Sequence, residues 1–242
     1  MITDILISAG GKGTRMKHLS QNMPKHMIDV QGRPFLHYLL DNVMKAGFKK
    51  IYLVVGYKKE NIERFAAQHP EYPITLIDQF GALPDKYGTA CPLICAEEYL
   101  SDKQFISIAG DNYYAQSDLR VMMAHNDELC YVGGLRHDHP EQHGVLVVNK
   151  ENILERIAEK SQEHVGNVIN SSLYKFTPDI FTAIHNVGLS PRGEYEITDA
   201  LSALAQRGKV RVEHIKDSWM DFGKPEDVER MAELLKTEQC QQ

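Results

Sequence analysis

The chain has 242 residues, a net charge of −6 and 43% hydrophobic residues, so it can bury the core of one large α/β domain or of two small ones. The acidic balance argues against nucleic acid or a membrane surface as a partner. No apolar run is long enough to span a membrane, and the N-terminus lacks the basic flank of a signal peptide. The four cysteines fit neither a zinc ribbon nor a disulfide framework, so we expect free thiols and a cytoplasmic protein.

The first half of the chain alternates predicted strands with predicted helices. Nearly all-apolar or strand-like runs predict strands at 4–8, 51–55, 74–77 and 104–112. Apolar residues at helical spacing predict helices at 34–46, 61–68 and 90–100. Pro34 at the start and Gly47 just past the end bound the first helix, and a long loop is expected at 79–89. This alternation is typical of a parallel sheet with right-handed crossovers.

The second half changes character, because its strand-like runs are separated mainly by short polar segments. The predicted strands lie at 130–135, 145–149, 168–176, 210–215 and 218–222. The predicted helices lie at 178–185, 198–206 and 225–236. We find no linker or repeat, so the prediction is a single α/β domain over 1–242. Its fold is doubly wound and Rossmann-like, with a mostly parallel mixed sheet and an antiparallel insertion in the second half.

A glycine-rich segment, "AGGKGTR" at 9–15, follows the first predicted strand. A Walker A loop is excluded, because Gly11-Lys12 is followed by Gly13 instead of Ser or Thr. The dinucleotide fingerprint is also excluded, because Met16 stands where its last glycine is required. The segment is therefore a phosphate loop of another kind.

The residue types in this segment suit a polyphosphate. Gly10, Gly11 and Gly13 allow backbone N–H groups to approach phosphate oxygens. Arg15 can donate to two oxygens at once, and Lys25, ten residues later in a Pro-Lys pair, adds a second positive charge. A tight turn with surface charges is the simpler alternative, but it does not account for the arginine and the lysine together.

Further motifs follow in order along nearly the whole chain. They read "YGTACPL" at 87–93, "AGDN" at 109–112, "HGVL" at 143–146, "EKS" at 159–161, "INSSLYKF" at 169–176, "SPRGEYEITDAL" at 190–201 and "WMDFGKPEDV" at 219–228. Together with the glycine loop, they resemble the sugar-1-phosphate nucleotidylyltransferases, which join a nucleoside triphosphate to a sugar 1-phosphate and release pyrophosphate. The last two motifs look closest to the glucose-1-phosphate thymidylyltransferase branch.

The resemblance implies a nucleotide-binding half at about 1–112 and a sugar-phosphate-binding half at about 113–242. Its nucleotide contacts fall on Ala9, Gly10, Gly11, Gly13, Thr14, Arg15, Gln79, Gly88, Thr89 and Asp111. Its sugar-phosphate contacts fall on Gly144, Glu159, Lys160, Asn170 and Arg192. The residues that it marks as catalytic are Arg15, Lys25 and Asp111.

The chemistry of such a reaction requires positive charge rather than a base. The attacking phosphate oxygen is already ionised at neutral pH, so catalysis is positioning plus neutralisation of charge. Mg²⁺ prefers one or two carboxylates together with phosphates and water. The resemblance assigns this metal to Asp111 and Asp221, each of which follows a strand-like run beside a glycine. The expected substrates are dTTP or UTP and glucose 1-phosphate.

Three departures from the family pattern lie in the sugar-binding half. His143, Ser161 and Ser172 stand where Tyr, Pro and Gly are usual. We therefore keep GTP or CTP, with mannose 1-phosphate or an unusual phosphorylated acceptor, as alternatives. A nucleotide-sugar glycosyltransferase and a non-catalytic sensor of nucleotide sugars are weaker ones. A glycosyltransferase usually needs an Asp-x-Asp pair. A non-catalytic sensor would not retain every charged residue of the family pattern. The sequence leaves open whether the protein forms a homo-oligomer.

Two other polar clusters have simpler interpretations. The first cluster consists of His137, His139 and His143. It has neither paired cysteines nor helical spacing, which argues against a zinc site. We therefore expect these histidines to be solvated loop residues near the sugar pocket. Acidic residues near Thr198 at a predicted helix start are expected to act as capping and dipole partners rather than as an acid/base pair: Glu194, Glu196 and Asp199. Trp219 is expected in the core or in a pocket wall.

Overall fold

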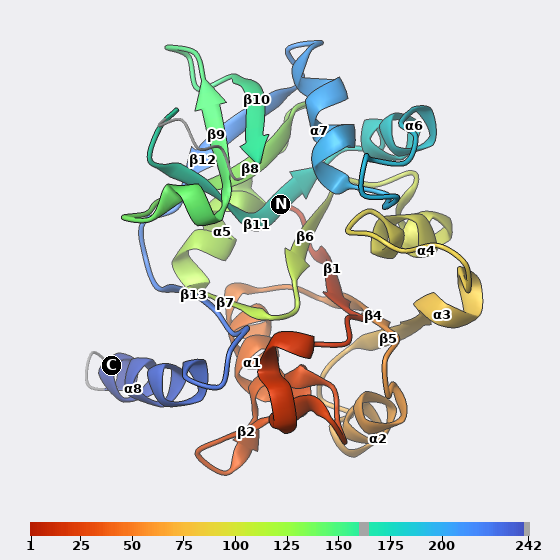
Figure 1. Cartoon of the computed structure of the whole chain (residues 1–242), viewed down its shortest axis with the longest axis vertical. Helices are drawn as coiled ribbons and strands as arrows, with labels where there is room; N and C mark the ends of the chain where they lie inside the picture. The colour runs from red at the N-terminus through yellow and green to blue at the C-terminus, as the bar shows by residue number, and fades with distance from the viewer. Residues whose placement is uncertain (160–164, 240–242) are drawn as a thin grey trace.

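The structure is a computed structural model that describes residues 1–159 and 165–239. A mixed β-sheet runs through the molecule and carries helices on both faces (Figure 1). Its strands follow the order β10-β9-β11-β6-β1-β4-β5, and β8 joins the sheet between β11 and β12. This arrangement confirms the predicted doubly wound α/β fold.

The first half forms the parallel part of the sheet, as predicted. Its strands are β1 (Asp4–Ala9), β4 (Lys50–Val55), β5 (Ile74–Asp78) and β6 (Phe105–Ala109). The helices of this half are α1 (Phe35–Ala46), α2 (Glu60–Gln68), α3 (Gln79–Ala82) and α4 (Cys91–Leu100). α1 ends at Gly47, whose φ of 113° is the left-handed conformation that glycine adopts readily.

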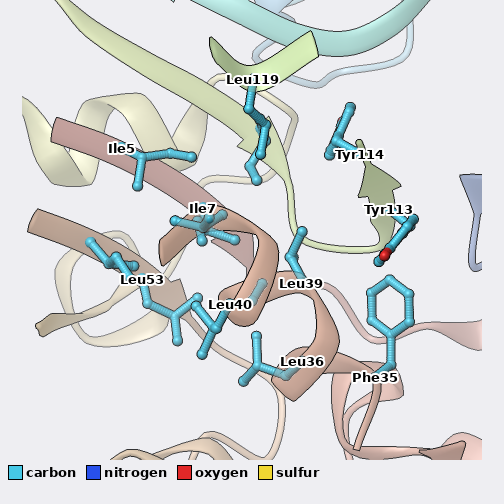
Figure 2. Packing of buried hydrophobic residues seen from close by; sticks show 14 of the residues in the cluster. Ile5, Ile7, Phe35, Leu36, Leu39, Leu40, Leu53, Tyr113, Tyr114 and Leu119 are labelled. Carbon is cyan, nitrogen blue, oxygen red and sulfur yellow. The ribbon is translucent and has the colours of Figure 1, made fainter. Parts of the chain in front are cut away.

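Strands β1 and β4 are buried on both sides, because helices cover each face of the sheet. Ile5 and Ile7 belong to one hydrophobic cluster with α1, α2, α5 and α8, whereas Leu6 belongs to a second cluster with α4, α6 and α7. Figure 2 shows the first cluster, in which β1 and β4 face α1 through Ile5, Ile7, Leu53, Leu36, Leu39 and Leu40.

The second half supplies antiparallel strands, as predicted, although β10 was not among the predicted strands. These strands are β8 (Cys130–Arg136), β9 (Gly144–Val148), β10 (Leu154–Glu159) and β11 (Val168–Phe176), and β12 (Val210–His214) pairs in parallel with β8. The helices are α5 (Gln116–Ala124), α6 (Asp179–Asn186), α7 (Ile197–Ala205) and α8 (Asp227–Gln239). A separate antiparallel ribbon joins β7 (Asn112–Tyr114) to β13 (Trp219–Asp221).

The structure corrects some boundaries and adds elements that the sequence analysis left unassigned. The loop expected at 79–89 begins with the short helix α3, and the strand expected at 104–112 stops at Ala109, after which β7 begins. β7 forms only because it pairs with β13, far along the chain. The added elements are α5, β10, β2 (Asp29–Val30), β3 (Arg33–Pro34), η1 (Thr14–Ser20), η2 (Lys25–Met27) and η3 (Pro140–Gln142).

No helix in the described part of the chain has both the length and the apolar character needed to cross a lipid bilayer. Cys91, Cys95 and Cys130 are buried free thiols, as predicted, and burial raises the pKa of Cys95 to about 11. These thiols are therefore protonated at neutral pH and unreactive. Cys240 lies outside the described residues.

Candidate active site

A cavity of about 410 Å³ opens where β1 and β6 end. The strand order reverses at this point, because β4 and β5 extend the sheet on one side of β1 and β6 lies on the other. Ligands of open α/β sheets bind at such a switch point, beside the carboxyl ends of the strands. Residues from both predicted halves line the cavity, namely Gly11, Lys25, Thr89, Asp111, Gly144, Glu159, Asn170 and Arg192.

The glycine loop after β1 is packed too tightly for side chains at two positions. Gly13 has a φ of 61°, and a Cβ there would approach Cβ of Lys25 at 3.1 Å. A Cβ on Gly10 would lie 2.9 Å from Oε1 of the buried Gln79. Glycine therefore lets the loop close against two other predicted site residues. Of the remaining predicted loop residues, Ala9 is buried at the end of β1, and Thr14 is exposed at the start of η1.

Arg15 and Asp221 lie beside the cavity and not in its wall. They line an adjoining hollow of about 530 Å³, and His143 lines both spaces. Nη1 of Arg15 lies 3.4 Å from Oδ2 of Asp221, while 58% of the arginine side chain stays exposed. The guanidinium can therefore still reach a phosphate group. Lys160 lies outside the described residues.

The β7–β13 ribbon brings the two predicted metal ligands together. Asn112, which follows Asp111, pairs with Asp221 across the ribbon. The backbone N–H of Phe222 also donates to the carbonyl oxygen of Asp111 at 2.7 Å. The ammonium of Lys25 forms an ion pair with the carboxylate of Asp111. Two carboxylates and two cations, Arg15 and Lys25, thus gather beside the glycine loop.

The charges and the burial of this group shift the pKa values of both carboxylates. Burial opposes the charge on Asp111, but the ammonium of Lys25 outweighs it, so the pKa of Asp111 lies below its ordinary value. Burial and the negative charge of Asp111 raise the pKa of Asp221. In residues 1–159 and 165–239 no three metal-binding side chains gather at one point. A pair of carboxylates suits Mg²⁺, which takes its remaining ligands from phosphates and water.

Glu196 lines the cavity and has a different role from the capping role that the sequence predicted. It occupies the N-cap position of α7, but its side chain makes no capping hydrogen bond, which corrects the expected role. Instead Nη2 of Arg192 lies 2.6 Å from Oε1 of Glu196, and Oγ1 of Thr89 donates to Oε2 at 3.0 Å. The N–H of Ile197 then donates to Thr89 at 2.9 Å. The i,i+4 spacing of the ion pair was the available sequence signal.

The turn that carries Gly88 is tied to the same segment. Gly88 has a φ of 134°, and a Cβ there would lie 2.2 Å from the carbonyl oxygen of Tyr195. That oxygen accepts a hydrogen bond from the N–H of Ala90 at 2.9 Å. The turn with the predicted nucleotide contacts Gly88 and Thr89 therefore packs directly against the segment that carries Arg192, although the two are about a hundred residues apart in sequence.

The histidine loop lies next to the cavity, as expected, but its members differ in position. The rings of His137 and His143 are 4.7 Å apart, and His143 lies 6.3 Å from the ring of Trp219. His139 is solvated, with 68% of its side chain exposed. Trp219 lines the adjoining hollow and donates from Nε1 to the carbonyl oxygen of Ser171 at 3.1 Å, so it is part of a pocket wall.

His26 lines the cavity and was missed by the sequence analysis. It is buried beside Lys25, and neither of its ring nitrogens has a hydrogen-bond partner. Burial, followed by the charge of Lys25, lowers its pKa to about 3, so the ring is neutral at physiological pH. Ser172 and Tyr174 of β11 also line the cavity without having been predicted as site residues.

A doubly wound sheet with a phosphate loop and paired carboxylates at its switch point defines a nucleotide-binding α/β enzyme. The sequence model of the family described as "Nucleotidyl transferase" matches residues 5–238. The chain therefore belongs to the nucleotidyl transferase family, and its enzyme class is that of the nucleotidyltransferases.

Individual relatives agree with this assignment. The UTP–glucose-1-phosphate uridylyltransferase AglF of Haloferax volcanii is 32% identical over 243 residues, which are 98% of each chain. The bifunctional protein GlmU of Methanocaldococcus jannaschii is 34% identical over 93% of this chain but only 52% of its own length, so this chain spans about half of it. A UDP-glucose pyrophosphorylase complexed with UDP-glucose shares the fold, with a TM-score of 0.83 at 20% identity, covering 98% of this chain and 100% of the other.

Proposed function

We propose that this nucleotidyltransferase joins UTP to glucose 1-phosphate, giving UDP-glucose and pyrophosphate. The observation that carries the proposal is one cavity with two charged ends. Lys25 and Asp111 stand at the phosphate loop, and Arg192 stands on the side of α7. The similarity to a relative named as a UTP–glucose-1-phosphate uridylyltransferase, over 98% of each chain, favours UTP. The motifs that resemble the thymidylyltransferase branch make dTTP the alternative.

The nucleotide would lie along the glycine loop. Backbone N–H groups of 10–13 would bind the triphosphate, and Gln79, Gly88 and Thr89 would contact the base. Asp111 and Asp221 would hold Mg²⁺, which supplies neutralisation of phosphate charge when bound. Arg15 and Lys25 would donate to the β- and γ-phosphates and stabilise the charge that develops on the departing pyrophosphate.

The sugar phosphate would enter from the side of β9, β10 and β11. Gly144 and Glu159 are neighbours across the β9–β10 pair, and Asn170 lies on the adjacent β11. These residues would contact sugar hydroxyls. Arg192, together with Lys160, would hold the phosphate group, and Glu196 would fix the guanidinium in place.

The transfer itself needs no protein base. An ionised oxygen of the sugar phosphate forms a bond to the α-phosphorus, while the bond from that phosphorus to the bridging oxygen of pyrophosphate breaks. The electron pair of the broken bond stays on pyrophosphate. The described residues would contribute orientation and positive charge, and binding of both substrates between the two charged ends would place the reacting atoms in line.

The test is a matrix of five nucleoside triphosphates against a panel of sugar 1-phosphates, with pyrophosphate release as the readout. We expect the highest kcat/KM for UTP with glucose 1-phosphate. A maximum at GTP or CTP with mannose 1-phosphate, or at an unusual acceptor, would keep the chemistry and replace the substrates. Absence of pyrophosphate release in every combination would overturn the proposal. Binding without turnover would then favour a sensor of nucleotide sugars.

A further inference from the structure

Ser172 combines an unfavourable backbone conformation with a position in the cavity wall. Its φ is 59°, in the left-handed region that L-residues other than glycine rarely adopt. The other non-glycine residues described with positive φ do not line the main cavity: Lys17, Gln31, Lys58 and Asn152. Such conformations persist where the surroundings impose them, and they gather at functional sites.

The surroundings of Ser172 impose its conformation through a bulge in β11. The register of β11 against β8 shifts between Asn170 and Tyr174. The N–H of Ser172 donates to Oδ1 of Asn170 at 3.0 Å, and Nδ2 of Asn170 donates to the hydroxyl of Tyr174 at 2.9 Å. All three residues line the cavity. The bulge thus places a run of β11 residues at the proposed acceptor side of the site.

The same bulge is anchored to the ribbon that carries the catalytic carboxylates. The hydroxyl of Tyr114 on β7 lies 3.0 Å from the carbonyl oxygens of both Ser171 and Ser172. The carbonyl of Ser171 also accepts from Nδ2 of Asn112 at 3.2 Å and from Nε1 of Trp219 at 3.1 Å. These donors come from β7 and β13, which present Asp111 and Asp221. The position of Ser172 is therefore held relative to the reacting phosphates.

We propose that Ser172 determines acceptor specificity, and that its strained backbone is retained because it holds the hydroxyl in the acceptor part of the cavity. The proposal rests on the proposed function. The hydroxyl narrows the cavity, and besides its hydrogen bond to the hydroxyl of Tyr174 it has hydrogen-bonding capacity left for a sugar hydroxyl. Glycine at this position would adopt the left-handed backbone conformation without strain, but it would neither narrow the cavity nor supply a hydroxyl. Stability and selectivity should therefore change in opposite directions.

The experiment compares Ser172→Gly and Ser172→Ala with the wild-type chain. Ser172→Gly should raise the melting temperature by about 2 °C, because strain is relieved. It should also lower the ratio of kcat/KM between the best and the second-best sugar 1-phosphate by about threefold to tenfold. Ser172→Ala keeps the strained backbone, so it should show the same loss of selectivity without the gain in melting temperature. The KM for the nucleoside triphosphate should stay unchanged in both variants.

Lys58→Gly is the matched control, because Lys58 has a φ of 49° in the turn between β4 and α2. It should raise the melting temperature by a similar amount and leave selectivity unchanged. A Ser172→Gly variant that gains stability with wild-type selectivity would overturn the proposal, as would one that gains no stability. Failure of the proposed function is distinguishable, because wild-type enzyme would then release no pyrophosphate with any acceptor.

Discussion

Each described cation assigned to a phosphate group is already paired with a carboxylate. The pairs are Lys25 with Asp111, Arg15 with Asp221 and Arg192 with Glu196. A guanidinium or an ammonium has more donors than one carboxylate uses, so it can bind a phosphate at the same time. The pairs therefore orient the cations before the substrates arrive, which suits a reaction catalysed by positioning.

Replacement of either carboxylate by its amide tests the metal assignment. Asp111→Asn and Asp221→Asn should each lower kcat by at least about 100-fold, because the charge that holds the cation at the phosphates is lost. Steady-state pyrophosphate release at saturating Mg²⁺ provides the measurement. Asp102→Asn, at an exposed turn, should leave kcat unchanged. Near wild-type, Mg²⁺-dependent turnover in both site variants would show that the metal lies elsewhere.

The β7–β13 ribbon is the element that assembles the site. It joins residues after β6 to residues before α8, and it places Asp221 next to the strand that begins after Asp111. Phe222 attaches the ribbon to α1, because its ring is fully buried and stacks on Phe35 at 4.3 Å with the planes 9° apart. Packing against α1 thus supports the geometry of the carboxylates.

Loss of this contact should reduce both stability and activity. Phe222→Ala should lower the free energy of unfolding by about 3–5 kcal/mol, because it leaves a cavity in the core. It should also lower kcat, because Asp221 is the preceding residue. Urea denaturation measures the first effect, and Val121→Ala at a 44% exposed position of α5 should change stability by less than about 0.5 kcal/mol. A loss below about 1 kcal/mol for Phe222→Ala would contradict the anchoring role.

At the scale of the whole molecule, the fold and the site depend on different forces. Two hydrophobic clusters, one on each face of the sheet, hold the helices in place. The site lies at the edge between these clusters and is built from loops and strand ends, as Figure 1 shows for the ends of β1 and β6. We therefore expect folding to be independent of the metal and catalysis to depend on it.

Removal of divalent cations separates these two properties. Incubation with excess EDTA should abolish pyrophosphate release, while the melting temperature should shift by less than about 2 °C, because Asp111 and Asp221, the predicted metal ligands, belong to neither hydrophobic cluster. Addition of Mg²⁺ should restore turnover to the wild-type rate. Full turnover in EDTA would exclude a metal from the reaction, and loss of the folded state in EDTA would assign the metal a structural role.

Local patterns in the sequence were sufficient for the parallel half of the fold. The strands and helices of this half depend mainly on residues close together in the sequence, such as continuous apolar runs and the helix-bounding Pro34 and Gly47. The bounds of β1, β4 and α1 were therefore predicted to within a residue or two. β7 was not predicted, because three residues form a strand only when a distant partner pairs with them. Helix α3 was missed because glycine and proline in 79–89 favour a loop.

The sequence by itself determined the fold class and the enzyme class, because short motifs in a fixed order indicate both, while the phosphate loop and the site residues stay predictions. Only the tertiary structure decided which of these residues meet. It paired Glu196 with Arg192 and Thr89, buried His26 without a partner, and placed Ser172 in the cavity in a strained conformation. These features arise from contacts between segments far apart in the chain, and backbone conformation and burial at one position are set by such contacts rather than by the neighbouring residues.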